Sequence, residues 1–276
     1  MEKLKRNERI AAIIKILGDQ PNKIFTLNYF TEKFTAAKST ISEDIMVVKQ
    51  SMEKMKLGKI QTISGAAGGV KFIPYTTKEQ NKEILENICQ HLGQKERILP
   101  GGFLYMADII YSPQMIHQLG EVFASQFDYK EVDYIITVET KGIPLAMMVA
   151  KAMNLPLVIL RRDSKVTEGS TVSINYVSGS SKKMQRMSLA RRAIKPNSKV
   201  IIIDDFMKAG GTAKGMMDMM KEFDTQVEGI GVLIATKEPQ EKLVEDYIPL
   251  LILEEVGEKS ESVEIYPNPA LIYPAL

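Results

Sequence analysis

Hydrophobic residues near the start of the chain follow a helical period. Four of them recur at positions i, i+3, i+4 and i+7 of one helical face, namely Ile10, Ile13, Ile14 and Leu17. Gly18 and Pro21 end this helix, and Thr26 is placed to cap a short second one. A third helix is expected to begin near Lys38. The pattern therefore predicts three short helices at the start of the chain.

Two strand-like runs follow these helices. They are KIQTIS and VKFIPY, and the glycine-rich linker GAAGG, from Gly65 to Gly69, joins them. Helices followed by a glycine-tipped hairpin are the order of a winged helix-turn-helix domain, which we expect over residues 1–74.

Apolar strand-like runs alternate with helical stretches through the rest of the chain, residues 75–276. The runs are VDYIITV, LPLVILRR, STVSINYV, KVIIID, VEGIGVLIA and PLLILEEV. Helical stretches lie around Pro113–Phe127, Ile143–Met153 and Thr212–Phe223. This alternation predicts an α/β fold with a mostly parallel sheet and helices on both faces. A further helical stripe that ends at Gly93 is expected to join the two domains.

Composition limits the cell compartment and the kinds of site that we expect for this protein. The 276 residues are 45% hydrophobic, which is enough for a substantial core. Cys89 is the single cysteine, so no disulfide can form within the chain. The start, MEKLKRNERI, lacks the apolar region of a signal peptide, and no apolar run reaches the roughly 18 residues of a membrane span. We therefore expect a cytoplasmic protein without a membrane partner. His91 and His117 lie far apart, and no metal-ligand cluster is apparent.

Positive charge is concentrated in the first domain. Residues 1–74 hold 13 Lys and Arg against 7 Asp and Glu, although the whole chain carries only +2. This excess fits a polyanionic partner such as DNA, but it also fits a solvated charged face or a small protein-interaction domain. The candidate DNA contacts lie at the start of the first helix, at the start of the third, and on the hairpin: Lys5, Arg6, Lys38, Ser39, Thr40, Ser42, Gly68 and Lys71.

The stretch VIIIDDFMKAGGT, from Val200 to Thr212, carries the clearest candidate chemistry. A buried strand leads directly into Asp204 and Asp205, whose carboxylates are suited to accept hydrogen bonds from two vicinal hydroxyls of a ribose. The backbone amides from Lys208 to Thr212 and the Thr212 hydroxyl can wrap a phosphate at the start of the next helix. The alternative is a solvated strand-to-helix turn.

Two further segments have phosphate-binding chemistry. In ETKGIPLA, Lys141 and Gly142 precede another helix start, which suits a second phosphate group. The segment from Arg161 to Lys199 holds ten Lys and Arg against two acids. It is expected to be either a charged loop that closes over a polyphosphate or an ordinary solvated hairpin.

These residues carry a resemblance that covers nearly the whole chain. VIIIDDFMKAGGT resembles the phosphoribosyl pyrophosphate (PRPP) motif of type I phosphoribosyltransferases, and its combination with a winged helix resembles the purine operon repressors of Gram-positive bacteria. The resemblance implies ribose contacts from the two aspartates, 5′-phosphate contacts from residues 208–212, and pyrophosphate contacts from residues 140–142 and, less securely, from Lys165. The implied effector site is Thr140, Lys141, Gly142, Lys165, Asp204, Asp205, Phe206, Met207, Lys208, Ala209, Gly210, Gly211 and Thr212.

The sequence also departs from the enzymes of that superfamily. Ala209 and Gly210 stand where many active transferases have Thr-Gly. No residue of the sequence identifies a pocket for a purine base. The resemblance therefore implies a sensor without catalytic residues, metal or required cofactor. The expected function is a homodimeric repressor of purine synthesis and salvage genes that PRPP releases from operator DNA, with ppGpp as a competing ligand. An active purine phosphoribosyltransferase and an RNA-binding antiterminator are the alternatives.

Overall fold

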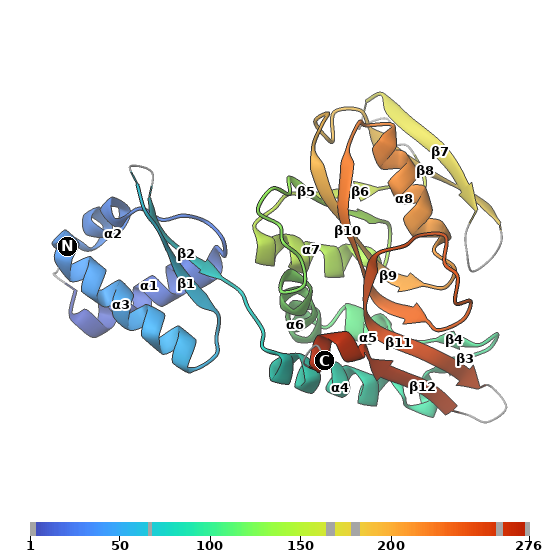
Figure 1. The fold of residues 1–276 in the computed structure, drawn as a ribbon, viewed down its shortest axis with the longest axis horizontal. Coiled ribbons are helices and arrows are strands. Elements are labelled where there is room, and N and C mark those ends of the chain that lie inside the picture. The colour runs from blue at the N-terminus through green and yellow to red at the C-terminus, as the bar shows by residue number, and fades with distance from the viewer. Residues whose placement is uncertain (1–3, 66–67, 164–168, 178–182, 258–261, 274–276) are drawn as a thin grey trace. The chain divides into compact units, whose positions relative to one another are not determined.

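A computed structural model describes residues 4–65, 68–163, 169–177, 183–257 and 262–273. The chain divides into two compact units, Met1–Thr77 with Lys151–Asn154, and Lys78–Ala150 with Leu155–Leu276. Figure 1 shows both units, with most of their helices and strands labelled.

The first unit is a winged helix-turn-helix, as its sequence pattern predicts. Its elements are α1 (Arg6–Asp19), α2 (Leu27–Phe34), α3 (Lys38–Lys54), β1 (Lys59–Ile63) and β2 (Gly69–Ile73). β1 and β2 pair in antiparallel fashion. The Thr26 hydroxyl accepts a hydrogen bond of 3.2 Å from the Tyr29 amide, which confirms the predicted cap of α2.

The core of this unit is formed by side chains from all three helices and the hairpin. Ile13, Leu17, Phe30 and Ile41 are among its buried residues. Ile14, predicted on the buried face of α1, is instead 37% exposed, because the face of α1 that packs is a narrow one centred on Ile13 and Leu17.

One glycine of the hairpin is required by close packing. A Cβ atom at Gly69 would lie 2.2 Å from the carbonyl oxygen of Phe25. The backbone of Phe25 exchanges two hydrogen bonds of 2.9 Å with the neighbouring Val70. Gly69 thus lets the hairpin dock beside the segment that leads into α2.

The second unit contains the remaining elements. They are α4 (Lys78–Leu92), η1 (Lys95–Arg97), β3 (Ile98–Leu99), β4 (Phe103–Leu104), α5 (Ala107–Ile110), α6 (Pro113–Ala124), β5 (Tyr134–Val138), α7 (Gly142–Met153), β6 (Leu157–Leu160), β7 (Thr171–Val177), β8 (Met184–Ala190), β9 (Lys199–Met207), α8 (Gly211–Lys221), β10 (Gln226–Thr236), β11 (Tyr247–Gly257), β12 (Ser262–Pro267) and α9 (Pro269–Ile272).

A six-stranded sheet organises this unit in the order β12-β11-β10-β9-β5-β6. All neighbours are parallel except β12, which pairs in antiparallel fashion with β11. The mostly parallel sheet predicted from the alternation of strands and helices is therefore confirmed. After β5 the chain returns to the sheet at β6, on one side of the β9–β5 pair. After β9 it returns at β10, on the other side. The point between β5 and β9 is thus a topological switch point, where open α/β sheets bind their ligands.

Two expectations for this unit need correction. STVSINYV forms β7, which is outside the central sheet and pairs with β8 as a separate antiparallel hairpin beside α8 (Figure 1). The described part of the basic segment thus includes a hairpin, and whether the segment closes over a polyphosphate stays a prediction. α4, expected to join the domains, belongs to the second unit and packs on β12 and α9, where the Asn81 side-chain amide donates to the Leu271 carbonyl at 3.3 Å.

Candidate functional site

Two loops at the switch point bring the predicted ligand residues together. The loop after β5 leads into α7 at Gly142, and the loop after β9 leads into α8 at Gly211. A Cβ atom at Gly142 would lie 2.5 Å from the Thr137 Oγ1 atom and 3.5 Å from the Asp204 Oδ1 atom. Only glycine fits so close an approach, and it places the start of α7 against the carboxylate pair at the end of β9.

Asp204 is buried and Asp205 is half-buried. Asp204 is only 4% exposed, and its Oδ1 atom accepts a 3.0 Å hydrogen bond from the Asp205 amide. Burial, and then the neighbouring charge of Asp205, raise the pKa of Asp204 well above its usual range. Burial also raises the pKa of Asp205, while the Lys141 ammonium opposes that rise. Ionised carboxylates here need hydrogen-bond donors, and two vicinal hydroxyls would supply them.

The turn after β9 has the geometry of an anion-binding loop. Gly210 has a φ of +80°, which favours glycine, and directly precedes α8. The carbonyl of Ala209 accepts from the Leu243 amide at 2.9 Å, and that of Lys208 accepts from the Lys242 ammonium at 2.6 Å. Residues 242–243 thus hold the loop in place through these two hydrogen bonds. The sequence did not indicate this role, because Lys242 and Lys208 are 34 positions apart in the chain.

The amides of this loop are free to meet a ligand. Within the described part of the chain, no turn or loop hydrogen bond is donated by the backbone amides from Ala209 to Ala213. They surround a hollow at the start of α8, where the helix dipole also favours an anion. The hollow is lined by Asp204, Phe206, Met207, Lys208, Ala209, Gly210, Gly211, Thr212 and Ala213.

The remaining predicted ligand residues are less fully placed. Thr140 and Lys141 are exposed in the loop after β5. Lys165 lies outside the described residues, as does the centre of the basic segment, residues 178–182. Arg161, at the start of that segment, forms an ion pair of 3.7 Å with Glu139.

A second candidate surface lies on the first unit. Lys38 is the first residue of α3, and Ser39 and Ser42 are exposed on its first turns. Lys38 and Gly68 line a single hollow with residues from the start of α2 and from the hairpin. Thr40, Gly68 and Lys71 are only partly exposed, whereas Lys5 is exposed. The helix start and the hairpin predicted to meet DNA are therefore neighbours.

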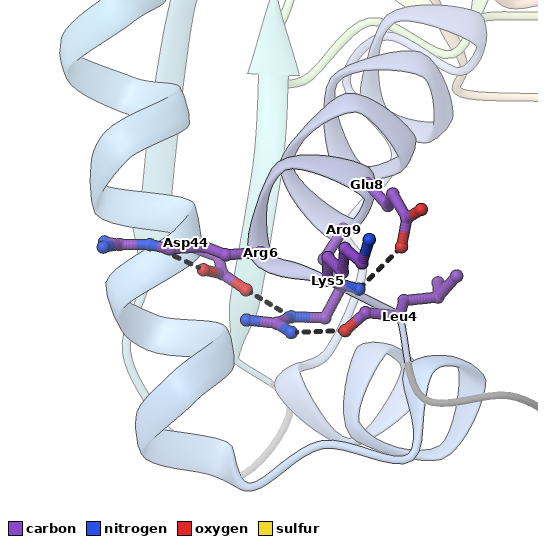
Figure 2. Close-up of polar contacts among 6 residues, drawn as sticks. All are labelled: Leu4, Lys5, Arg6, Glu8, Arg9 and Asp44. Atoms are coloured by element: carbon purple, nitrogen blue, oxygen red, sulfur yellow. Dashed lines mark hydrogen bonds and ion pairs between the residues drawn. The ribbon is translucent and has the colours of Figure 1, made fainter.

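Figure 2 shows an ion-pair group that joins α1 to α3 in the first unit. The Arg9 Nε atom donates to Asp44 Oδ2 at 2.7 Å, and its Nη1 atom donates to the Leu4 carbonyl at 2.9 Å. Arg6 approaches the other oxygen of Asp44, with its Nε atom 3.4 Å away, but keeps a side chain that is 60% exposed. Asp44 thus ties α1 to α3 and also orients Arg6, one of the predicted DNA contacts.

The exposed face of α3 includes further residues that were not among the predicted DNA contacts. Met46, which is 60% exposed, and Gln50 follow Ser42 at intervals of four residues and so lie on the same helical face. Glu43 is exposed beside them. Continuing the four-residue spacing from Ser42 would have found Met46 and Gln50 from the sequence.

The residues that the structure describes contain no group of three or more His, Cys, Asp or Glu side chains that could hold a metal ion. They also contain no helix long and apolar enough to cross a membrane.

Comparisons with known proteins match two separate parts of the chain. Residues 5–74 match the family described as bacterial purine repressor, N-terminal, and residues 106–265 match the phosphoribosyl transferase domain. The purine biosynthesis transcriptional repressor PurR of Bacillus subtilis is 47% identical over 263 residues, which cover 95% of this chain and 92% of that protein. The purine biosynthesis transcriptional activator PurR of Lactococcus lactis is 38% identical over 262 residues, covering 95% and 97%.

A solved structure extends the likeness to the fold. The adenine phosphoribosyltransferase of Thermoanaerobacter pseudethanolicus has a TM-score of 0.51 and 18% identity, and the match covers 60% of this chain and 98% of that one. At this identity the likeness concerns the fold alone.

Proposed function

The chain belongs to the bacterial purine-repressor family, and from this membership we propose that it is a homodimeric, DNA-binding repressor of purine biosynthesis genes that PRPP releases from its operator. The observation that carries the proposal is the combination of the winged helix with the buried Asp204 and the half-buried Asp205 beside an anion-binding loop. A two-fold dimer would present two recognition helices to an inverted repeat.

The chemistry of PRPP fits the three parts of the ligand site. The Asp204 and Asp205 carboxylates would accept hydrogen bonds from the ribose hydroxyls. The amides of residues 208–212 would hold the 5′-phosphate at the start of α8, and residues 140–142 would meet the pyrophosphate at the start of α7. ppGpp, which also carries diphosphates, would compete for the same loops and oppose the effect of PRPP.

A gel-shift titration tests this function. The full chain is incubated with a promoter fragment of a purine biosynthesis gene, with and without PRPP. Binding that PRPP weakens is the expected result, because an effector shifts an equilibrium only through its different affinities for the two states. Tighter binding to duplex RNA than to duplex DNA would favour an RNA-binding antiterminator instead.

Activation of transcription is the second candidate function. The relative from Lactococcus lactis, at 38% identity, is named an activator. In transcription from the same promoter with purified polymerase, a repressor lowers the transcript yield in the absence of PRPP. An activator instead raises the yield when PRPP is present.

We predict that the protein does not transfer the phosphoribosyl group to adenine, guanine, hypoxanthine or xanthine. The sugar and phosphate ligands are present, but catalysis also needs a positioned base and a stabilised leaving pyrophosphate. Pyrophosphate release is measured with each base and PRPP, with an active phosphoribosyltransferase as positive control. Turnover of about 1 s⁻¹ or faster with any of these bases would show an active enzyme.

Replacing Lys38 with alanine is expected to make DNA binding less dependent on salt. Each lysine that neutralises a phosphate adds about 0.9 to the slope of log affinity against log salt, so Lys38→Ala should lower the slope by about that amount. The matched control is Lys15→Ala, because Lys15 is an exposed lysine of the same unit that forms an i,i+4 pair with Asp19. Equal slopes for Lys38→Ala and wild type would remove Lys38 from the DNA-binding surface.

A further inference from the structure

Lys242 joins the phosphate loop, residues 208–212, to the end of the neighbouring strand. Its ammonium donates to the Lys208 carbonyl at 2.6 Å, to the Thr236 carbonyl at 2.7 Å and to the Thr236 hydroxyl at 3.3 Å. Lys208 directly follows β9, and Thr236 is the last residue of β10, which pairs with β9 in parallel. An ammonium has three protons, so these three oxygens match its hydrogen-bonding capacity.

The residues after Lys242 also lie against the phosphate loop. The Leu243 amide donates to the Ala209 carbonyl at 2.9 Å. A Cβ atom at Gly210 would lie 3.2 Å from the Leu243 nitrogen and 3.3 Å from the Val244 Cγ2 atom. Val244 is itself buried in the core of the second unit. The segment that contacts the loop is therefore anchored in the core.

The bonds to the two loop carbonyls fix the direction of the loop amides. The peptide bonds from Lys208 to Gly210 are trans, and the C=O and N–H of a planar trans peptide point to opposite sides. Because the Lys208 and Ala209 carbonyls point towards residues 242–243, the Ala209 and Gly210 amides point away from them. Ala209 and Gly210 both line the hollow at the start of α8, so their amides are left for a ligand there.

We propose that Lys242 is a positioning residue for the effector, which holds the amides of the phosphate loop in the direction of the phosphate before the ligand binds. Lys242 acts from behind the loop, since it does not line the hollow. Its charge adds to the effect, because an ammonium on a carbonyl oxygen polarises the peptide and makes the N–H of the same peptide a better donor. This inference rests on the proposed function, since it takes the loop as the site of a sugar phosphate.

Lys242 is half-buried, unlike an ordinary surface lysine. Burial lowers the pKa of its ammonium, and the nearby Glu238 carboxylate opposes this change. Lys221, an exposed lysine of α8, differs in this respect, because its hydrogen bond to Asp218 raises its pKa. Lysine side chains seldom leave water unless other oxygens replace it, and here the replacement comes from the phosphate loop and the end of β10.

Lys242→Met tests the inference by removing the ammonium while keeping an unbranched side chain. In calorimetry the full chain should bind ribose 5-phosphate about 10-fold more weakly, because the ligand must then order the loop itself. PRPP should lose affinity by the same factor, since its 5′-phosphate is the group that this loop would hold. Lys221→Met is the matched control, because it removes the same charge from an exposed position of α8. It should bind both ligands as wild type does.

Chemical restoration of the ammonium separates positioning from loss of structure. Lys242→Cys should bind ribose 5-phosphate about as weakly as Lys242→Met. Treatment with 2-bromoethylamine lets the new thiolate displace bromide and form a thioether that carries an aminoethyl group, so most of the affinity should return. Cys89 is the only other cysteine of this variant, and burial raises the pKa of its thiol to about 12, so it should react slowly. Wild-type protein treated in the same way is the control.

Three results would overturn the inference and leave the proposed function intact. The first is wild-type affinity of Lys242→Met for ribose 5-phosphate. The second is a much larger loss for PRPP than for ribose 5-phosphate, which would indicate damage to the whole site. The third is no recovery of affinity when Lys242→Cys is alkylated. If wild-type protein binds neither ligand, the proposed function fails, and this inference fails with it.

Discussion

A protein carrying both Asp204→Ala and Asp205→Ala is expected to bind its operator and to ignore PRPP. The two carboxylates would supply the hydrogen bonds to the ribose hydroxyls, and each charge-assisted bond typically contributes about 1.5–3 kcal/mol. Loss of both should weaken PRPP binding on the order of 100-fold or more. The predicted DNA surface is on the other unit, so operator affinity should remain.

Burial of these two carboxylates lowers the stability of the ligand-free fold, and this supports a role in ligand binding. Both have a raised pKa in the folded protein, mainly because they are buried. A group whose pKa is raised on folding favours the folded state below its unfolded pKa, and this contribution is lost as the pH rises through the folded pKa. At neutral pH the ligand-free site therefore lowers the stability of the fold, as expected of a binding site that only a ligand completes.

The measurement is a gel-shift titration with operator DNA at increasing PRPP, run beside calorimetry with PRPP. The matched control is Glu241→Ala with Glu245→Ala, which removes the same charge from two exposed positions of the same unit. Non-specific DNA shows whether loss of negative charge raises DNA affinity in general. If the double variant is released by the same PRPP concentration as wild type, the assignment of Asp204 and Asp205 is wrong.

Local patterns predicted most of the elements of this fold. The helical period of the first residues gave α1, and the Thr26 cap gave the start of α2. The apolar run before Asp204 gave β9, the centre of the sheet. In each case the property that decides the structure, such as residue spacing or a capping hydroxyl, lies within a few positions along the chain.

Pairing between distant segments was not predictable in the same way. STVSINYV has the composition of a sheet strand, yet it pairs with Met184–Ala190 outside the central sheet. No local property distinguishes these two destinations, since the choice depends on packing against α8. The contact of Lys242 with the phosphate loop was missed for the same reason.

Asp44→Ala is expected to destabilise the winged helix far more than any surface substitution in it. The Asp44 side chain is almost fully buried and pairs with Arg9, which is also buried, at 2.7 Å. Removing one partner of a buried ion pair leaves an uncompensated charge and typically costs about 3–5 kcal/mol. Arg9 would keep its bond to the Leu4 carbonyl but would lose its counter-charge.

Hydrogen exchange of the full chain in increasing urea measures this effect. Amides of α1 and α3 should lose protection at lower urea, while those of β9 and β10, in the other unit, should be unchanged. Arg6→Ala is the control, since its side chain is largely exposed and an exposed pair contributes about 0–1 kcal/mol. Replacing the pair by Arg9→Met with Asp44→Leu should recover most of the stability, because it leaves no buried charge. A loss of less than about 1 kcal/mol for Asp44→Ala would show that the ion pair does not hold α1 against α3.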